Sequence, residues 1–364
     1  MTRTILLAIA VAAAMSQARP GDDRAAIQAV PDIAYDADAN FLKLPPQVYL
    51  GEAAGVAVNS QGHVFVFSRG GTTGPAFGAA AAQLLEFDRN GDFIREIGRN
   101  LYALSYAHSV RVDRQDNIWI VDKGSDMVVK FDPSGRVTMV FGRKKEASDE
   151  ATPWTRVTPP RPHVDGYFRQ PTDVTWDTQG NIFISDGYIN ARVAKYDKNG
   201  DWVKSWGQKG TKDGEFDTPH NIASDARGNI YVADRGNRRI QVFDPDGTFL
   251  RSMSVVNVPV PPDARPAIGN PPTAEATGTQ APGAPWTICI TPGPNQVLYT
   301  SDSFPGRIYK LSLDGKVLGV LGKAGKQPRQ FGWIHEIACP AENELYVAEV
   351  LNWRVQKLTL RLPK

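Results

Sequence analysis

Three of the five histidines, His108, His220 and His335, occupy the same place in three copies of a pattern that recurs along this 364-residue chain. Each lies two residues before the first apolar residue of a short predicted strand. Neutral imidazoles are good zinc ligands, and three protein ligands leave a fourth position open for water or substrate, which is typical of catalytic zinc. The spacing therefore indicates a three-histidine zinc site, provided that the fold brings the three copies together.

The fold must be inferred from the recurring pattern itself. Each copy has a short apolar strand, a turn rich in Asn, Asp and Gly, a second strand of β-branched and aromatic residues, a polar loop and a third strand; a further turn such as "DPDG" leads to an outer strand. Four antiparallel strands repeated six times are the signature of a six-bladed β-propeller. We therefore predict an all-β fold with a single six-bladed propeller over residues 19–364. The copies resemble NHL-type repeats, and they begin at Gly55, Ser109, Asp173, Asn221, Thr287 and Glu336.

Aligning the six copies places the histidines in blades 2, 4 and 6. Blades 1, 3 and 5 carry Ala54, Thr172 and Trp286 at that position. Alternate blades of a six-fold ring are related by a pseudo-three-fold axis, so the three imidazoles should converge at the centre. A single histidine there would more often be a hydrogen-bonded lining residue, but three in alternate blades favour a metal. The other two, His63 and His163, break the pattern, and we interpret them as ordinary polar residues.

The residues that follow the second strand of each blade should lie at the same end of the ring as the histidines. Neighbouring strands are antiparallel, so the first strand begins where the second ends. These residues are Arg69, Lys123, Tyr188 and Arg235. Taken singly, arginines there are usually solvated, and a tyrosine packs on its neighbours. Their coincidence with the histidines favours a functional role for Arg69, Tyr188 and Arg235, whereas Lys123 is interpreted as a solvated charge.

Aspartates near these residues recur at one repeat position in four blades, which favours a structural turn role over catalysis; they are Asp122, Asp186, Asp234 and Asp302.

Three segments depart from the regular repeat. Residues 41–50, "FLKLPPQVYL", precede the first copy, and we predict that they supply the outer strand that the sixth copy lacks. Insertions at 144–169 and 255–285 lie between an outer strand and the next inner strand, and both open on the histidine face. Loops of this length are usually functional or disordered. A lid and a surface excursion are both compatible with their composition.

The N-terminus predicts export. Residues 1–18 combine Arg3, an apolar run from Ile5 to Met15 and small residues at Ser16 and Ala18, as in a secretory signal. We expect a mature protein that is secreted or periplasmic. The formal charge of +2 gives no reason to expect a nucleic-acid or anionic-membrane partner, which leaves a small molecule or peptide as the expected partner.

The two cysteines, Cys289 and Cys339, are compatible with one disulfide. Without a framework or a CxxC spacing, the favoured interpretation is two small buried hydrophobic residues.

Several motifs resemble the peptidyl-α-hydroxyglycine α-amidating lyase family over nearly all of the chain after the signal. The most specific is "QPTDVTWDTQGNIFISDGYINARV"; "YAHSVRVD", "GEFDTPHNIA", "VADRGNRRIQVF" and "WIHEIA" are also similar. The resemblance implies cleavage of an N–C bond to give an amide and glyoxylate. It also implies zinc on His108, His220 and His335, a catalytic Tyr188, and active-site arginines at Arg69 and Arg235.

The same resemblance implies a structural calcium held by the backbone carbonyls of Val56 and Val110 and the carboxylate of Glu336. The family usually has Asp at the last position, and the extra methylene of Glu shifts the oxygens, which weighs against calcium. The family's disulfide pairs have no counterpart, because Ile189 stands where a half-cystine is expected. Animal members often work with a copper monooxygenase. We expect no such domain here, because six blades account for the chain, so any hydroxylating enzyme would be a separate protein.

Two alternatives remain beside the amidating lyase. One is another zinc propeller enzyme, acting on small α-hydroxy amides or lactones; propeller lactonases usually need carboxylate-rich calcium sites, which the histidine set does not supply. The other is a non-catalytic NHL-type binding scaffold, since fold does not fix function. A scaffold has no need of three convergent histidines, so metal content separates it from the enzymes.

Overall fold

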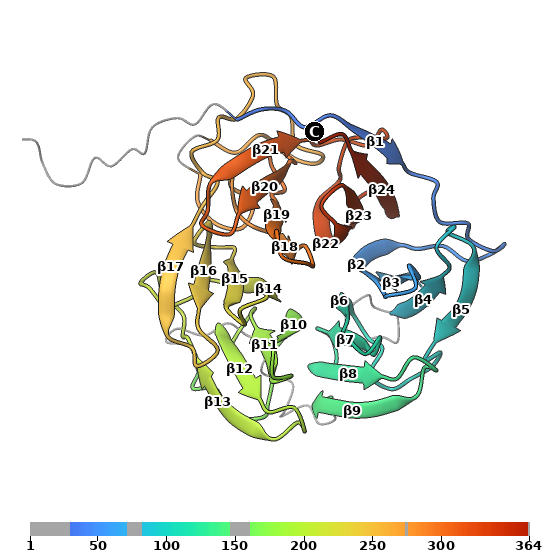
Figure 1. Cartoon of the computed structure of the whole chain (residues 1–364), viewed down its shortest axis with the longest axis vertical. Coiled ribbons are helices and arrows are strands. Elements are labelled where there is room, and N and C mark those ends of the chain that lie inside the picture. Colours follow the sequence, from blue (N-terminus) through green and yellow to red (C-terminus); the bar gives the residue numbers. More distant parts are fainter. Residues whose placement is uncertain (1–29, 71–81, 146–160, 274–275, 363–364) are drawn as a thin grey trace, which may run out of the picture.

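The described residues form a ring of six four-stranded antiparallel sheets, the blades of a β-propeller (Figure 1). The computed structural model describes residues 30–70, 82–145, 161–273 and 276–362. The predicted signal and most of the first insertion therefore lie outside the described residues. Every regular element in the described ranges is a strand, so the prediction of an all-β, six-bladed propeller is confirmed.

The first three blades follow one another along the chain, each ordered from the axis to the rim. They comprise β2 (Glu52–Val58), β3 (Val64–Arg69), β4 (Gln83–Phe87) and β5 (Phe93–Ile97); β6 (Ala107–Val112), β7 (Ile118–Asp122), β8 (Met127–Phe131) and β9 (Val137–Gly142); and β10 (Asp173–Trp176), β11 (Ile182–Asp186), β12 (Arg192–Tyr196) and β13 (Trp202–Trp206).

The last three blades repeat this order, except that the rim strand of blade 6 comes from the N-terminal side. They comprise β14 (Pro219–Ser224), β15 (Ile230–Asp234), β16 (Arg239–Phe243) and β17 (Phe249–Met253); β18 (Thr287–Ile290), β19 (Val297–Ser301), β20 (Ile308–Ser312) and β21 (Val317–Leu321); and β22 (Ile334–Ala341), β23 (Glu344–Glu349), β24 (Arg354–Leu360) and β1 (Tyr35–Asp38).

Burial follows the radial position of each strand. The second strands are buried on both faces, as in β7, β11, β15 and β19. The rim strand β17 instead alternates between half-buried and exposed residues up to Met253. Adjacent blades meet through hydrophobic clusters, and the described residues form six of them, one at each blade interface. Because this burial joins neighbouring blades, the ring is one packed unit.

Aspartate-led turns set the length of the hairpins. Asp225 Oδ1 accepts hydrogen bonds from the backbone N–H groups of Arg227 (2.8 Å) and Asn229 (2.9 Å). Gly228 supplies the positive φ of +87° that this turn requires. The same arrangement recurs at Asp113, Asp132, Asp177 and Asp244, which explains the periodic Asp, Asn and Gly of the sequence.

The ring closes through a different segment from the one expected. Residues 35–38, and not 41–50, pair with β24 as the rim strand of blade 6, with Tyr35 opposite Leu360. Residues 41–50 instead connect this strand to blade 1, where the Lys43 N–H donates to the carbonyl of Gly91 at 2.8 Å. Two prolines, Pro45 and Pro46, interrupt this segment. Because proline donates no ladder hydrogen bond, the proline-free segment before it makes the better strand.

The interpretation of the cysteines as unpaired hydrophobic residues was wrong. Cys289 and Cys339 are buried and form a disulfide between the inner strands of blades 5 and 6. The two Cα atoms lie 6.1 Å apart, within the span a disulfide bridges. Nothing in the local sequence brings the two residues together, because the contact depends on how neighbouring blades pack.

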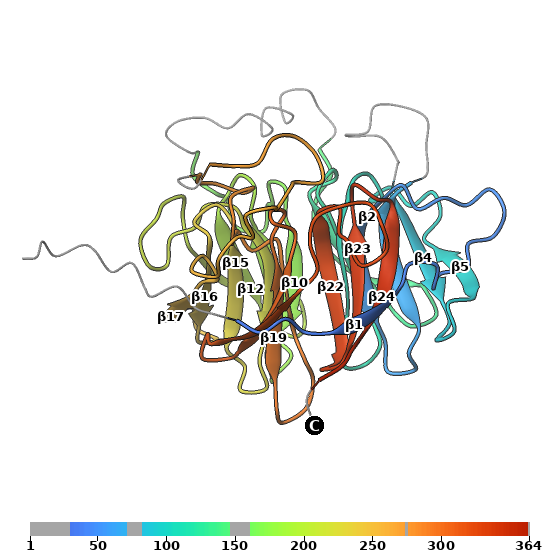
Figure 2. The ribbon, with the colours of Figure 1, turned by 90° about the horizontal axis from the view of Figure 1, so that it is seen from above.

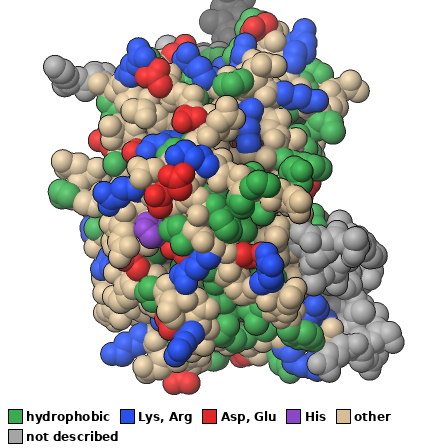
Figure 3. Space-filling model, turned by 90° about the vertical axis from the view of Figure 1, so that its right-hand side faces the viewer, with side chains coloured by type: hydrophobic (Ala, Val, Ile, Leu, Met, Phe, Trp, Pro, Cys, Tyr) green, Lys and Arg blue, Asp and Glu red, His purple; other side chains and the backbone are tan. Residues whose placement is uncertain are grey.

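The described residues of the inserted segment, 255–273 and 276–285, arch over one face of the ring, shown in orange in Figure 2. Its described part is anchored by hydrogen bonds from Arg238 to the carbonyls of Pro282 (2.8 Å) and Ala276 (3.1 Å). On the side of the molecule shown in Figure 3, acidic and basic side chains are interspersed. Within the described ranges, we find no helix with the length and apolar character that a membrane span requires.

Candidate metal centre

The three repeat-aligned histidines converge at the axis of the ring. One nitrogen from each of His108, His220 and His335 lies within 4.8 Å of the corresponding nitrogens of the other two. Their ring centroids are 4.6 to 4.9 Å apart, and all three side chains are buried. Each histidine lies at or next to the start of an inner strand, in β6, β14 or β22. The pseudo-three-fold arrangement expected from the repeat is therefore present.

Each imidazole is oriented by the blade that follows it. The Nδ1 atoms of His108, His220 and His335 lie 2.6, 2.6 and 2.7 Å from backbone carbonyl oxygens. A carbonyl only accepts, so each Nδ1 carries the hydrogen and each Nε2 keeps its lone pair. The three carbonyls belong to the residues at the same repeat position in the alternate blades: Thr172, Trp286 and Ala54.

The electrostatic environment keeps the three rings neutral. Burial lowers the pKa of all three imidazoles well below the usual value, and the positive charges of Lys123, Arg69 and Arg235 act in the same direction. Neutral rings with Nδ1 held by carbonyls are the form in which histidine binds zinc. By the chemistry of their donor atoms, these residues fit a zinc ion.

Tyr188 lies directly beside the histidines. Its hydroxyl oxygen is 3.0 Å from Nε2 of His220 and 3.2 Å from Nε2 of His108. Burial acts to raise the pKa of this phenol, but Lys123, Arg235 and Arg69 outweigh it, so the net pKa lies below the usual value. A lowered pKa increases the fraction of phenolate at neutral pH, and the phenolate is the form that can accept a proton.

The two predicted arginines make different contacts near the histidines. Arg235 is buried, with its guanidinium carbon 5.6 Å from the centroid of the Tyr188 ring and 4.5 Å from that of Trp286. Arg69 is bonded to Glu52 at 2.6 Å and to the Tyr106 hydroxyl at 3.1 Å through the same nitrogen. Both arginines therefore lie at the histidine end of the ring, but Arg69 is already engaged by a carboxylate.

The interpretation of Lys123 as a solvated charge was wrong. Its ammonium nitrogen lies 3.6 Å from the centroid of the Tyr188 ring and 5.7 Å from that of Tyr106. The signal was available, because Lys123 follows strand β7 at the same repeat position as Arg69 and Arg235, one position before the place that Tyr188 holds in its blade. Tyr106, two residues before His108, was missed altogether. The structure thus adds a third cation and a second phenol to the candidate site.

The second insertion helps to position an aromatic side chain of this site. The indole N–H of Trp286 donates to the carbonyl of Thr279 at 2.7 Å, and the Trp286 ring packs against Trp333 and His220. The insertion therefore holds the aromatic ring on which Arg235 stacks.

The recurring aspartates have the structural role that was predicted. Asp122, for example, accepts backbone N–H groups from Ser105, Tyr106 and Ser125 at 2.8 to 3.0 Å. Asp186, Asp234 and Asp302 likewise accept backbone N–H groups in their own blades.

The two remaining histidines lie outside the cluster, where they make single polar contacts to Glu86 (His63) and Arg192 (His163).

The residues expected to hold calcium are arranged differently from that expectation. Glu336 Oε2 accepts the backbone N–H groups of Val56 (2.9 Å) and Val110 (3.1 Å), the two residues whose carbonyls were expected as ligands. The other oxygen, Oε1, lies 3.1 Å from Nε of Arg111. Burial raises the pKa of Glu336 to about 8, the nearby Arg111 guanidinium acts to lower it, and the Asp173 carboxylate acts to raise it.

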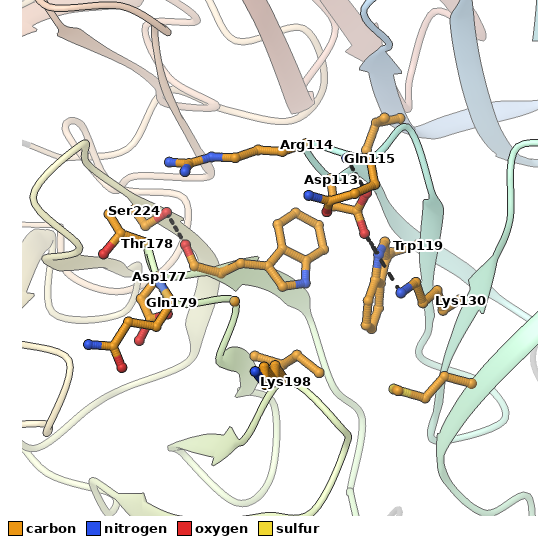
Figure 4. Close-up of a pocket in the computed structure, with 15 residues that line it drawn as sticks. Asp113, Arg114, Gln115, Trp119, Lys130, Asp177, Thr178, Gln179, Lys198 and Ser224 are labelled. Carbon is orange, nitrogen blue, oxygen red and sulfur yellow. Dashed lines mark hydrogen bonds and ion pairs between the residues drawn. The ribbon is translucent and has the colours of Figure 1, made fainter.

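A separate cavity of about 380 Å³ lies between blades 2 and 3. Trp119 and Lys130 line it on one side and Thr178 and Lys198 on the other (Figure 4). It includes turn residues that follow the inner strands, at the end away from the histidines, and none of the predicted site residues line it.

Comparison with known proteins agrees with this architecture. A family model described as NHL repeat matches residues 216–243, which contain β14, β15 and β16. Virginiamycin B lyase from Staphylococcus aureus superposes with a TM-score of 0.54 over 90% of this chain and 100% of its own, at 11% identity. At that identity the likeness concerns the fold alone.

The sequence matches include amidating enzymes and an NHL repeat-containing protein. Peptidyl-alpha-hydroxyglycine alpha-amidating lyase 1 of Drosophila melanogaster is 26% identical over 72% of this chain and 46% of its own length. Peptidylglycine alpha-amidating monooxygenase of Rattus norvegicus is 27% identical over 45% of this chain and 17% of its own. NHL repeat-containing protein 3 of Homo sapiens is 30% identical over 59% and 58%.

The matches thus span less than half the length of the two amidating enzymes. They still agree with the motifs, and this chain is a six-bladed propeller of NHL-type repeats related in sequence to the peptidyl-α-hydroxyglycine α-amidating lyases.

Proposed function

We propose that this chain is a zinc-dependent lyase that cleaves a peptidyl-α-hydroxyglycine, R-CO-NH-CH(OH)-COO⁻, into the amide R-CO-NH₂ and glyoxylate. The observation that carries the proposal is the approach of the Tyr188 hydroxyl to the Nε2 atoms of His108 and His220. It puts a proton acceptor beside the atoms that would hold the metal. The name of the fly relative, an α-amidating lyase, supports the same reaction class, and the name of the rat relative supports a link to peptide amidation.

His108, His220 and His335 would hold the zinc through Nε2, because Nδ1 is committed to a carbonyl in each ring. A zinc ion bound there would lower the pKa of a hydroxyl group beside it.

Tyr188 would act as the base. Its phenolate takes the proton of the substrate hydroxyl, the C–O bond becomes the carbonyl of glyoxylate, and the C–N bond breaks with its electron pair going to nitrogen. The phenol then returns a proton to that nitrogen, which completes the amide and regenerates the base.

Arg235 would bind the substrate carboxylate through two parallel hydrogen bonds, a geometry that suits a guanidinium. Arg69 is held by Glu52 and Tyr106, so we assign it to fixing that side of the site and to supplying positive charge near the developing glyoxylate. Lys123, stacked on the Tyr188 ring, would favour the phenolate.

The setting of this reaction follows from the N-terminal sequence and the substrate chemistry. We propose that the protein acts after export, outside the cell or in a periplasm, on a peptide or small molecule. The α-hydroxyl group requires a prior hydroxylation, which a separate enzyme would perform.

A binding scaffold is the second candidate, because the human NHL repeat-containing protein 3 matches this chain at 30% identity. The amidating lyase is favoured over it by the neutral, carbonyl-anchored histidines, since a scaffold does not require them.

The deciding experiment measures glyoxylate release from a short α-hydroxyglycine peptide, with zinc quantified in the same samples. We expect about one zinc per chain in the wild type, and loss of both zinc and release in His220→Ala. His63→Ala, a histidine outside the cluster, is the matched control and should keep both. Zinc without release would redirect the search to other α-hydroxy amides or lactones, and absence of both would favour the scaffold.

A further inference from the structure

The residues directly after the six aligned positions form a second layer around the axis, which we call the polar layer. Its members, one from each blade, are Gly55, Ser109, Asp173, Asn221, Thr287 and Glu336. Apart from Gly55 they are polar, and all of the polar members are buried. Buried polar groups are stable only when they are hydrogen-bonded, so the partners of this layer reveal what it does.

Three members each bond to the backbone of the next blade along the chain. In each case a side-chain oxygen accepts the N–H of the residue that follows the polar layer in the neighbouring inner strand. These bonds run from Ile222 to Asp173 (3.0 Å), from Ile288 to Asn221 (2.7 Å) and from Ile337 to Thr287 (3.2 Å). The layer therefore fastens the inner strands of adjacent blades to one another.

Glu336 serves two blades because blade 1 has no side chain in this layer. Its Oε2 accepts the N–H of Val56 in blade 1 and reaches past Gly55 to the N–H of Val110 in blade 2. A Cβ atom on Gly55 would lie 2.7 Å from the nitrogen of Val110 and 2.8 Å from Glu336 Oε2, so only glycine leaves room for this reach. The length of Glu, compared with Asp, is explained by this second bond.

Arg111 places a positive charge in the same layer. From blade 2, its guanidinium makes a two-pronged pair with Asp173 at 3.0 and 2.6 Å, and Nη2 also donates to Asn221 Oδ1 at 3.0 Å. It further approaches the carbonyl of Ile288 (3.4 Å) and Glu336 Oε1 (3.1 Å). The Nε hydrogen is directed at Asp173, so the contact with Glu336 is electrostatic.

These contacts do not fit a calcium ion on Glu336. One carboxylate oxygen already accepts two N–H groups, and an ion bound to the other would lie against the guanidinium, where like charges repel. We propose that the guanidinium of Arg111 is the resident cation of the polar layer and that the chain binds no calcium at Glu336. The guanidinium would take the place of a metal ion in the channel, as a positive charge that binds oxygen atoms from several blades.

The proposal predicts that removing the guanidinium creates a divalent-cation site. Arg111→Ser leaves oxygen atoms of Asp173, Asn221, Ile288 and Glu336 around the vacated volume, and oxygen donors with two carboxylates are what calcium prefers. Melting temperature and bound calcium are measured with calcium-free protein and after adding calcium, at constant zinc. We expect no change for the wild type, and for Arg111→Ser a lower melting temperature that added calcium raises by about 5 °C.

Two control variants separate charge from position. Arg111→Lys keeps a cation in the layer and should not respond to calcium. Arg361→Ser removes an exposed arginine paired with Asp36 on blade 6 and should behave like the wild type. Zinc content, followed in every sample, reports the histidine site separately, so a failure of the proposed lyase function would not be mistaken for a failure here.

Two results would overturn the proposal: stoichiometric calcium or a calcium-dependent melting temperature in the wild type, or a folded Arg111→Ser protein that ignores calcium. If Arg111→Ser folds only with calcium, the proposal is supported. If it folds under neither condition, the wild-type measurement decides.

Discussion

The six aligned positions form a layer around the axis, which we call the histidine layer, and the polar layer lies one residue further along the inner strands. Both layers come from the same repeat, but their polar atoms have different bonding partners. Each histidine gives Nδ1 to a neighbouring blade and keeps Nε2 for a ligand. In the polar layer, the carboxylates, the Asn221 amide oxygen and the Thr287 hydroxyl bind backbone groups or Arg111, whereas the Ser109 hydroxyl and Glu336 Oε1 are buried without a hydrogen bond to any described residue. The comparison teaches that one layer is free to bind, while its neighbour holds the blades together.

The largest effect should come from removing the proposed base of the histidine layer. Tyr188→Phe deletes the hydroxyl near two Nε2 atoms and keeps the ring. We expect turnover to fall by about 10³-fold, the usual contribution of a general base, with zinc content unchanged. Tyr102→Phe, at an exposed tyrosine, is the control. A Tyr188→Phe protein within tenfold of the wild type would remove Tyr188 from the mechanism.

A smaller loss is expected from Arg235→Lys, which keeps the charge and removes the planar fork. A lysine cannot make the two parallel hydrogen bonds to a carboxylate, so we expect kcat/KM to fall by about 100-fold. Arg361→Lys on the rim should have no effect. If Arg235→Lys retained wild-type kcat/KM on an α-hydroxyglycine peptide, the carboxylate clamp would have to be sought elsewhere.

Lys123→Met should have a milder effect that depends on pH. Lys123 is one of the cations that lower the pKa of Tyr188, so its loss raises that pKa and reduces the phenolate fraction at neutral pH. We expect kcat near pH 7 to fall by about tenfold and the rising limb of the pH profile to move to higher pH. Lys123→Arg, which keeps the charge, should restore most of the activity. An unshifted limb in Lys123→Met would mean that the lysine only packs on the ring.

The smallest effect is expected in the polar layer, and it should appear in stability. Thr287→Val preserves the shape of the side chain and removes the oxygen that accepts the N–H of Ile337. The free energy of unfolding should fall by about 1 to 2 kcal/mol, the cost of a lost buried hydrogen bond, while zinc and turnover stay unchanged. Thr138→Val, at an exposed threonine, should leave stability unaltered. A loss of zinc in Thr287→Val would show that the two layers are not separable.

Much of this site could be predicted because the position of a residue in the repeat determines its position in the ring. Residues at one repeat position lie at one depth and one radius in the ring, so aligning the copies was enough to bring His108, His220 and His335 together. The same alignment placed Tyr188 and the arginines at the histidine end. The alignment also gave the position of Lys123, but it could not give the direction of the side chain. A long side chain at that position can point either to solvent or to the Tyr188 ring.

The pairing of Cys289 with Cys339 and the role of Arg111 could not be predicted in this way. Both depend on contacts between blades, and the repeat specifies only each blade's own strands. The choice of residues 35–38 over 41–50 as the closing strand likewise depends on which segment can reach β24 with its backbone donors intact.

The sequence by itself determined the blade count, the order of the three inner strands of each blade and the end of the ring at which the histidines lie, because hydrophobic period and turn chemistry are local properties of the chain. Only the tertiary structure decided which polar atoms form hydrogen bonds or ion pairs within the protein and which remain available to bind a ligand. That outcome depends on the distances between neighbouring blades, where a bond of 2.6 Å to a carbonyl fixes a histidine and a guanidinium at 3.1 Å faces the carboxylate expected to bind calcium.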